Sequence, residues 1–315
     1  MSQLTNSQAR VIDPILSAVA RSYTQMTRVG MALFPTVPVM QRGGRIITFG
    51  KEDLMSFNNT RRAPGQNTKR VQFGYAGSVF ALEDHSLEGQ VPYETQQEAE
   101  AVPGIDVASR TVNGVQEQIA NRLEYAQALL ATTAANYAAS NKVTLAGTAQ
   151  WSDFTTGVSD PISDVETAKE AVRQQTGRRP DKMVIGAAVF AKLKQHPKIV
   201  DRLKYTQREV ATVELLAALF GLREVLVGDA ITSSDAGVVS DVWGKFAVLA
   251  YTPIASLAAQ GLPSYGYTYQ LAGMPLVEEP YVDRNAKSWI YPVTDVCAPV
   301  IAGAEAGYLI SAAVA

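Results

Sequence analysis

The chain has 315 residues, of which 47% are hydrophobic and 18% are charged, and its formal net charge is −2. This length and apolar content predict a sizeable core built as two subdomains, and the charged fraction lies below the roughly 25% of average soluble domains, which favours burial of surface between subunits. A pI near 5.8 argues against a protein whose main task is to hold duplex DNA, because such proteins carry a strongly basic domain.

Residues 1–44 are predicted to form an arm rather than a domain. Residues 10–23 carry apolar side chains at helical spacing and predict a short amphipathic helix. Residues 33–39 are predicted to be extended, because each of two prolines pushes the preceding residue away from helical backbone. Such a ribbon either adds to a sheet of its own chain or lies against a neighbouring subunit, and Leu33, Phe34 and Val37 are candidate intersubunit contacts.

A charge reversal follows the arm. The tract Thr60–Arg70 is basic, whereas residues 71–109 contain acids and no Lys or Arg. Runs typical of strands flank the tract, at Arg45–Phe49 and at the alternating residues 71–75, and Pro64 and Gly65 mark a turn. Two strands with so long a connection predict a projecting hairpin, which is marginally stable alone and needs a neighbour.

The two oppositely charged segments suit contacts between copies of the chain. We hypothesise that these contacts join the basic side chains to the first acids that follow, and the candidate residues are Arg61, Arg62, Lys69, Arg70, Glu83, Asp84 and Glu88. The alternative is a solvated surface loop whose charges only keep it soluble.

The longest helical pattern runs from Val112 to Tyr137 and has one apolar face. It predicts a spine helix of about 40 Å at 1.5 Å per residue. The face is rich in alanine and has few flanking opposite charges, so packing against a sheet is favoured over a coiled coil.

Alternating helix and strand patterns follow and predict a mixed α/β unit. A capping box at Ser163–Glu166 predicts a helix start, and Gly177 and Gly221 predict helix ends. Further helices are expected around residues 189–193, before Pro197, and around residues 213–220. Strands are expected at 182–186, 225–227 and 246–250.

The last segment, residues 288–315, is rich in β-branched residues and predicts strands that return to the spine helix. Its single cysteine, Cys297, lies among apolar neighbours and is predicted to be a small core residue in a reducing compartment. Upstream, Tyr265, Tyr267 and Tyr269 alternate at strand spacing, which favours a sheet face over a platform for sugars or bases.

Residue chemistry gives little support to an enzyme. His85 and His196 have no second histidine at metal-ligand spacing. The glycines before Phe246 are spaced too widely for a phosphate loop, and Phe246 stands where that loop carries a Ser or Thr. No Gly-x-Ser-x-Gly elbow occurs, and no supporting partner for an acid/base pair at Glu83 and Asp84 is visible. The sequence predicts no catalytic residue, metal or cofactor.

The order of arm, long hairpin, spine helix, α/β unit and returning strands resembles the Hong Kong 97-type major capsid proteins of tailed bacteriophages. Local runs that resemble phage capsid sequences span nearly the whole chain, at residues 33–39, 60–65, 81–85, 176–180, 196–199 and 215–221. No single run has the specificity of a catalytic motif, so the resemblance depends on their shared order.

The resemblance implies an α+β Hong Kong 97-type capsid fold and a structural protein. It implies an N-terminal arm at 1–44, an extended loop at 45–90 that lies on the adjacent subunit, a peripheral domain with the spine helix at 91–179, an axial domain at 180–275 and returning peripheral strands at 276–315. The implied function is self-assembly into the hexamers and pentamers of an icosahedral phage head that encloses double-stranded DNA. The implied location is the virion, after assembly in the host cytoplasm.

Partners follow from the same resemblance. The main partner is a second copy of the chain. The resemblance implies a portal and, as an option, a decoration protein. A separate scaffolding protein is expected, if one is used, because the chain starts at Met1 close to its arm and leaves no room for a scaffolding segment of its own. Contact with packaged DNA is expected to be weak and non-specific, and no membrane partner is expected, since no run approaches the roughly 20 apolar residues of a spanning helix. The alternative within this fold is an encapsulin-type compartment that loads a protein cargo.

Overall fold

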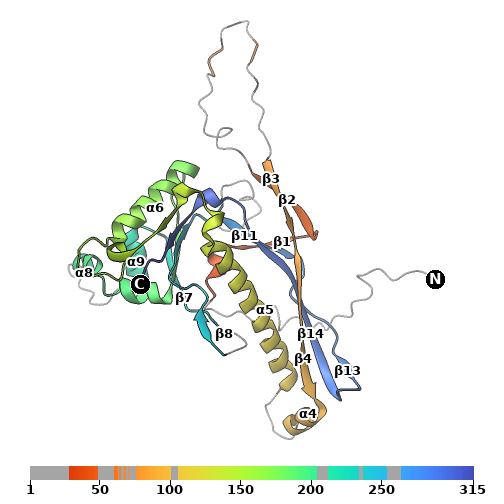
Figure 1. Ribbon diagram of the computed structural model, residues 1–315. Coiled ribbons are helices and arrows are strands. Elements are labelled where there is room, and N and C mark those ends of the chain that lie inside the picture. The colour runs from red at the N-terminus through yellow and green to blue at the C-terminus, as the bar shows by residue number, and fades with distance from the viewer. Residues whose placement is uncertain are drawn as a thin grey trace.

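The computed structural model describes residues 28–48, 60–62, 64, 67–68, 70, 76–100, 106–203, 212–233, 237–253 and 264–315. Within them, an elongated sheet and a more compact α/β unit lie on either side of one long helix (Figure 1). The predicted helix at 10–23, the predicted strand at 71–75 and Lys69 lie outside the described residues.

The described α-helices range from one turn to more than seven turns. They are α2 Gly30–Leu33, α4 Tyr93–Glu100, α5 Val107–Thr132, α6 Pro161–Thr176, α7 Ala187–Leu193, α8 Pro197–Leu203 and α9 Val213–Phe220. Short 3₁₀ turns lie at Ala134–Asn136, Ala139–Asn141, Gly147–Ala149 and Ala304–Ala306.

The described strands form two large sheets and two separate pairs. The elongated sheet contains β1 Thr36–Val39, β4 Glu83–Pro92, β11 Gly266–Leu271, β12 Leu276–Val277, β13 Tyr281–Asp283 and β14 Ser288–Ile301. The α/β sheet has the order β5 Lys142–Thr144, β15 Gly307–Ser311, β10 Ala247–Ala250, β6 Lys182–Gly186, β7 Glu224–Gly228. The pairs are β2 Gly43–Thr48 with β3 Ala76–Ala81, and β8 Ile231–Ser233 with β9 Val239–Asp241.

Strand β14 is the centre of the elongated sheet. β4 runs antiparallel along one edge of it for ten residues, and β11, β12 and β13 pair along its other edge. Helix α5 packs across β4 and β14, and the buried core between them consists of Val91, Val112, Val115, Ile119, Val277, Tyr291 and Val293. A Cβ at Gly89 of β4 would lie 2.2 Å from Cγ2 of Thr111. Glycine therefore allows the helix to approach the strand closely.

Helix α5 confirms the predicted spine, but it ends at Thr132 and does not continue to Tyr137. The hydroxyls of Thr132 and Thr133 donate to carbonyls four residues back, at 2.8 and 2.6 Å, and Thr133 has extended backbone. Hydroxyls that compete for backbone groups in this way weaken a helix. Tyr137 folds back after the end, where its hydroxyl donates to the carbonyl of Ala131 at 2.7 Å.

Alternate residues of the α/β sheet face two different cores, as the period of a strand requires. One face, including Met183, Ile185 and Leu249, packs under helices α6, α7, α8 and α9. The other face, including Val184 and Val248, packs toward α5 and α2. The predicted strands at 182–186, 225–227 and 246–250 are therefore confirmed, and both of their faces are buried.

Each sheet joins segments that are far apart in the chain. Helix α6 packs on the α/β sheet, where β15 pairs with β10. Strand β11 pairs with β1 and β14 in the elongated sheet. Local patterns predict that a strand exists without stating which sheet it joins, because pairing is decided by contacts between distant residues.

Helix boundaries in the α/β unit follow caps. Gly177 and Gly221 have φ values of 70° and 61° and end α6 and α9 as predicted. The predicted start of α6 at Ser163 is wrong, because Asp160 is the N-cap and accepts from the backbone N–H of Ser163 at 3.2 Å. Pro161 then occupies the first helical position, which suits its fixed φ.

The segment Val29–Phe34, which we call the wedge, lies where the two sheets meet α5. Its residues were expected to be extended from Leu33 onward, but Gly30–Leu33 form one helical turn before β1 adds parallel to β11. Leu33 and Phe34 have no exposed surface, and the ring of Phe34 lies 5.4 Å from that of Tyr265. The assignment of Leu33 and Phe34 as intersubunit contacts is therefore wrong, because both side chains are buried in their own chain.

We expect Phe34→Ala to lower the free energy of unfolding by about 3–5 kcal/mol, because it leaves a cavity at a fully buried site. Met40→Ala is the matched control, since Met40 is 86% exposed and surface substitutions stay within about 0.5 kcal/mol. Urea denaturation of dissociated subunits, followed by circular dichroism, measures both. A Phe34 variant as stable as the Met40 variant would contradict the burial of the wedge.

A buried histidine lies in the α/β unit. Nε2 of His196 is 3.1 Å from Oγ of Ser159, and the ring meets the edge of Phe154. Burial lowers the pKa of His196, and the charge of Lys198 lowers it further, while Asp160 acts in the opposite direction. The folded chain therefore favours the neutral imidazole.

This burial predicts a loss of stability in acid. The unfolded chain takes up a proton at His196 as the pH falls through about 6.5, whereas the folded chain, with its lowered pKa, takes it up only at lower pH. The stabilising contribution is complete above that range and declines below it. We expect His196→Asn to flatten the dependence of the free energy of unfolding on pH between about 7 and 5.5. Parallel curves for the variant and the parent would contradict this expectation.

Candidate assembly surface

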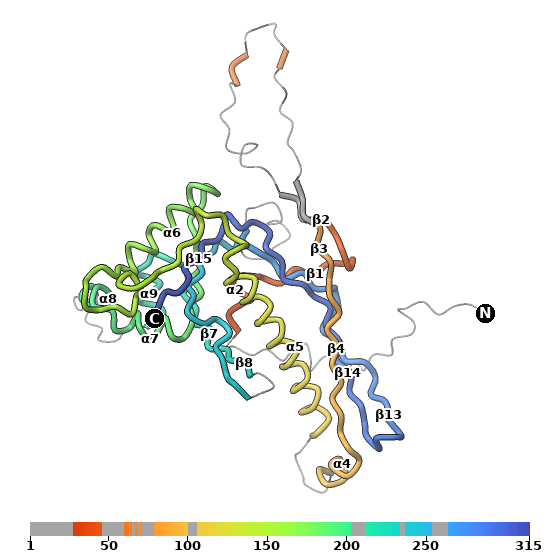
Figure 2. Tube along the Cα trace, in the orientation of Figure 1, coloured from red at the N-terminus to blue at the C-terminus, as the bar shows by residue number. Residues whose placement is uncertain are grey.

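The β2–β3 pair projects from one end of the elongated sheet. Its register runs from Gly43 opposite Ala81 to Thr48 opposite Ala76, and among the described strands β2 and β3 pair only with each other. The described residues of the basic tract lie beyond the pair, at the opposite end of the molecule from α4 (Figure 2). A two-stranded ribbon of this kind has little stability of its own.

Two contacts hold the base of this projection. The ring of Phe80 stacks on that of Tyr269 in β11, with centroids 4.2 Å apart and an interplanar angle of 14°. A Cβ at Gly44 would lie 2.9 Å from the Phe80 ring, so the absence of a side chain leaves room for the stack. Nη1 of Arg42 lies 2.5 Å from Oδ2 of Asp84. These contacts attach the projecting strands to both β11 and β4.

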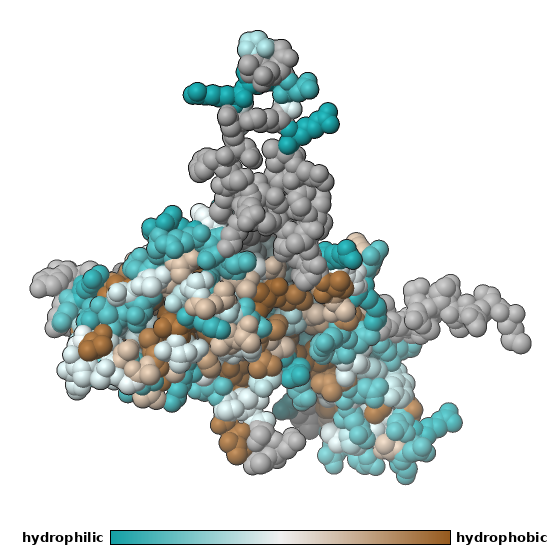
Figure 3. All heavy atoms as spheres, turned by 45° about the horizontal axis from the view of Figure 1, so that its top comes forward, coloured by the Kyte–Doolittle hydropathy of each residue, from teal (hydrophilic) through white to brown (hydrophobic). Residues whose placement is uncertain are grey.

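Three of the four predicted basic side chains are described by the structure, and all three are exposed. They are Arg61, Arg62 and Arg70, whereas Lys69 lies outside the described residues. The described part of the connection is hydrophilic over its visible surface (Figure 3). The positive charges therefore lie on a part of the chain that extends beyond the body of the subunit.

The predicted acids lie on β4 but not on one face. Strand alternation places Asp84 and Glu88 on the exposed face, whereas Glu83 projects from the face on which Gly89 and Val91 pack under α5. All three acids are exposed.

Two of these acids already have partners in their own chain. Asp84 pairs with Arg42, and the carboxylate of Glu88 accepts from the hydroxyl of Tyr281 at 3.2 Å. A carboxylate has about four acceptor positions, so both groups can accept a further donor.

Val37, the third apolar residue predicted as an intersubunit contact, lies in β1. It pairs opposite Tyr269 in the parallel β1–β11 ladder and is partly buried. The ribbon that contains it thus adds to the sheet of its own chain, which was the first of the two alternatives for residues 33–39.

Exposed apolar side chains are candidate contact residues that the sequence reasoning missed. Val79 is 72% exposed at the base of the projection, Met40 is also exposed, and Ile231, Val238 and Val239 are exposed on or beside the β8–β9 pair. Larger contiguous patches of this kind mark surfaces that become covered in assemblies. The adjacent valines at 238 and 239 were the one available signal, because alternation of a half-buried strand would bury only one of them.

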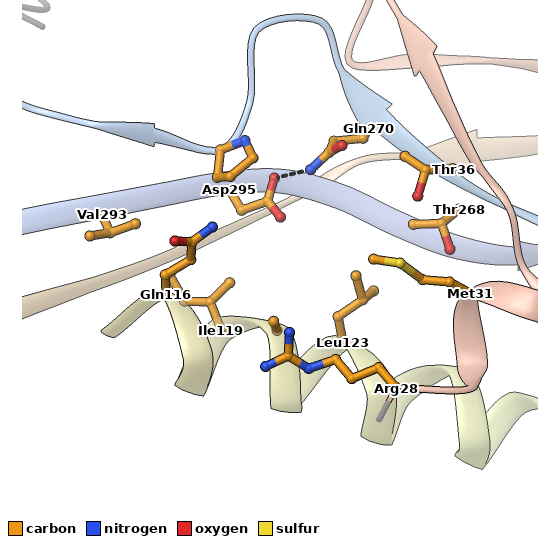
Figure 4. Close-up of a pocket in the computed structure, with 12 residues that line it drawn as sticks. Arg28, Met31, Thr36, Gln116, Ile119, Leu123, Thr268, Gln270, Val293 and Asp295 are labelled. Atoms are coloured by element: carbon orange, nitrogen blue, oxygen red, sulfur yellow. Dashed lines mark hydrogen bonds between the residues drawn. The ribbon is translucent and has the colours of Figure 1, made fainter. Parts of the chain in front are cut away.

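A hollow of about 170 Å³ lies between α5, the wedge and the elongated sheet. On the wall of the hollow, the side-chain amide of Gln270 donates to the carboxylate of Asp295 at 2.8 Å. Arg28, which precedes the wedge, lines the hollow next to α5 (Figure 4). Burial raises the pKa of Asp295, and burial together with the neighbouring Asp295 raises the pKa of the Cys297 thiol. The thiol is therefore poorly reactive, which agrees with the predicted role of Cys297 as a small core residue.

The described side chains form no metal-binding group. Within the ranges given above, no three His, Cys, Asp or Glu residues come together in a way that could hold an ion. No helix among the described residues is long and apolar enough to cross a membrane.

The elongated sheet, the long helix across it, the α/β unit and the projecting pair together define the Hong Kong 97-type capsid fold, an α+β fold. The solved capsid of the cyanophage P-SCSP1u has the same fold, with a TM-score of 0.60 over 92% of this chain and 89% of that chain at 12% identity. This likeness shows the fold alone.

Sequence relatives identify the family. The chain is 38% identical to the major capsid protein of Burkholderia phage BcepMu over 97% of both proteins, and the family described as phage major capsid protein E matches residues 131–289. A phage-related protein from Bordetella bronchiseptica, solved by crystallography, has 44% identity and a TM-score of 0.81 over 97% of this chain and 99% of that chain. The chain belongs to the phage major capsid protein family.

Family membership establishes the broad function. The chain is a structural capsid protein and not an enzyme, it associates with copies of itself, and it is part of the virion shell. Because the sequence relatives are named phage capsid proteins, a phage capsid is supported over the alternative of a cargo-enclosing compartment.

We expect Phe80→Ala to loosen the projecting strands without unfolding the body. The change removes an aromatic stack worth about 0.5–1.5 kcal/mol beyond its buried area, at the point where the projection meets β11. Hydrogen exchange should become faster in residues 43–48 and 76–81 and stay unchanged in α6. Val79→Ala, on the exposed face of the same strand, is the control and should leave exchange unaltered. Equal protection of the strands in both variants would show that the stack does not anchor them.

Proposed function

We propose that this chain builds the hexamers and pentamers of an icosahedral phage head that encloses double-stranded DNA. The observation that supports this most directly is the β2–β3 projection, which carries exposed arginines away from the body of a chain whose β4 strand exposes acids. A subunit with this shape presents a basic limb and an acidic surface at different places. Copies can therefore contact one another around a closed ring.

In this proposal, Arg61, Arg62, Lys69 and Arg70 of one copy contact the acidic surface around Glu83, Asp84 and Glu88 of the next. Each exposed ion pair contributes only about 0.2–1 kcal/mol, so a single contact can dissociate and correct an error during growth. Many such contacts per shell add up to a stable assembly. Covered apolar surface, such as that at Val79 and Met40, contributes about 25 cal/mol per Å² and supplies the larger stabilisation.

The body of the subunit divides into the regions that assembly would use. The proposed peripheral domain contains α5 and the elongated sheet with β11 and β14, and the proposed axial domain contains the α/β sheet with α6 to α9 and β15. Val37, in the β1–β11 ladder, remains a proposed contact at the edge of the peripheral sheet. The proposed N-terminal arm, residues 1–44, contains the wedge and β1.

Further partners are part of the same proposal. A portal, a separate scaffolding protein and a decoration protein would bind the shell, and assembly would take place in the host cytoplasm. A chain with a net charge of −2 would contact packaged DNA loosely and without sequence preference, because tight binding to duplex DNA depends on many Lys and Arg contacts to phosphate.

We expect the double variant Arg61→Glu, Arg62→Glu to reduce the yield of closed shells without changing the melting temperature of the subunit. Charge reversal turns two attractive contacts into repulsive ones in each copy, and the effect should weaken as salt rises toward 1 M, where the Debye length is about 3 Å. Sedimentation and negative-stain electron microscopy of the expressed chain, alone and with scaffolding protein, measure the yield.

A compensating variant provides the control. Adding Glu83→Arg and Glu88→Arg to the double reversal should recover part of the yield, because the two surfaces again carry opposite charges. Asp84 is left intact since it pairs with Arg42. Shells of normal number and form from the Arg61, Arg62 variant would refute the contact assignment. A parent chain that stayed monomeric with every partner would refute the proposed shell.

A further inference from the structure

The carboxylate of Glu124 lies at the junction of three parts of the molecule. Glu124 belongs to α5 and is 2% exposed. Its Oε1 accepts from the backbone N–H of Val29 at 3.1 Å and, like Oε2, from that of Gly30 at 3.0 Å. Oε1 also accepts from Nε1 of Trp243 at 2.8 Å. The spine helix is thus bonded both to the wedge and to the α/β unit through one side chain.

The donors that surround Glu124 are held in place by close packing. A Cβ at Gly30 would lie 2.7 Å from Oε2 of Glu124 and 2.2 Å from Oε1 of Gln127, so only glycine brings this backbone N–H so near. Trp243 is 1% exposed, and a Cβ at Gly228, at the end of β7, would lie 2.2 Å from its indole ring. The carboxylate therefore meets donors that have little freedom to move away.

The rest of the wedge repeats this pattern of polar bonds to several parts of the chain. The carbonyl of Ala32 accepts from Nζ of Lys182 in β6 at 3.1 Å and from the hydroxyl of Thr252 at 3.0 Å. One turn beyond Glu124 on α5, Gln127 donates to Thr268 of β11 at 2.8 Å. Glu124 is the member of this network that carries a buried charge, and a buried carboxylate is stable only when all its donors are present.

We infer that Glu124 is a positioning residue for assembly: it fixes the orientation of the α/β unit and the wedge relative to the spine helix. The inference rests on the proposed closure into shells. In a closed shell the angle between the two parts of every subunit determines the curvature at every contact, so a small change in that angle is repeated in each copy. A substitution at Glu124 should therefore change the geometry of the assemblies beyond what its effect on stability explains.

Glu124→Gln tests this inference, because glutamine keeps the size of the side chain but removes the charge and turns an amide N–H₂ group toward the donors. Val172→Ala is the stability control, since Val172 is fully buried on α6 and absent from the junction. Electron microscopy should show a broadened distribution of shell diameters, open sheets or tubes for Glu124→Gln. The yield of wild-type-sized shells should fall by about tenfold or more, as expected for the loss of a charge-assisted hydrogen bond.

The other outcomes are distinguishable. If Glu124→Gln and Val172→Ala both lower the melting temperature and both give shells of wild-type diameter, Glu124 only stabilises the fold and the inference is overturned. If the parent chain also forms no shells, the proposed function fails instead. Should Glu124→Gln not fold, Trp243→Phe serves in its place, because it keeps an aromatic ring and removes the indole N–H. That variant should shift shell diameter in the same direction by a smaller amount, and unchanged diameters would again overturn the inference.

Discussion

The structure depends on how the wedge fills the junction between the two sheets and the spine helix. Leu33 and Phe34 have no exposed surface and pack among residues from α5, the α/β sheet and the segment that leads into β11. Without them, the inner face of the α/β sheet would lack part of its core, and burial of such side chains is the main favourable contribution to folding. A short segment from the start of the chain thus joins parts whose other residues follow much later in the sequence.

This constraint separates two kinds of contact. The buried contacts of the wedge lie within one chain, and their loss would lower the free energy of unfolding. Such contacts suit a subunit that must keep one shape in many copies. The proposed contacts between Arg61, Arg62 and the acids of β4 would each be weak, because solvent screens exposed ion pairs. A rigid body with weak, repeated surface contacts has the physical properties that error-correcting assembly requires.

The base of the projection connects the buried contacts of the subunit with the exposed charges. Phe80 stacks on Tyr269 and Arg42 pairs with Asp84, so the limb that carries the exposed charges starts from the rigid sheet. Asp84 illustrates why a charge pattern alone is ambiguous. The sequence shows an acid that could face a neighbouring copy, whereas the structure shows that its carboxylate first meets an arginine 42 positions earlier in its own chain.

Local patterns in the sequence determined much of this protein. The apolar period predicted α5, the glycines at 177 and 221 predicted the ends of α6 and α9, and short runs of consecutive apolar residues predicted β6, β7 and β10. These features depend on residues within one or two turns of each other, so they can be read from neighbouring positions. The order of the elements was also sufficient for the resemblance to phage capsid proteins.

Only the tertiary structure decided which elements meet. It placed β15 beside β10, buried Leu33 and Phe34 inside their own chain, separated Glu83 from Asp84 and Glu88, and brought Glu124 to Trp243. Each of these outcomes depends on contacts between residues far apart in sequence, and an apolar or charged side chain carries no local mark of its distant partner. A hydrophobic ribbon such as residues 33–39 can be buried either against a sheet of its own chain or against a neighbouring copy. Which of the two occurs depends on whether the rest of the chain leaves room for the ribbon beside its own sheet.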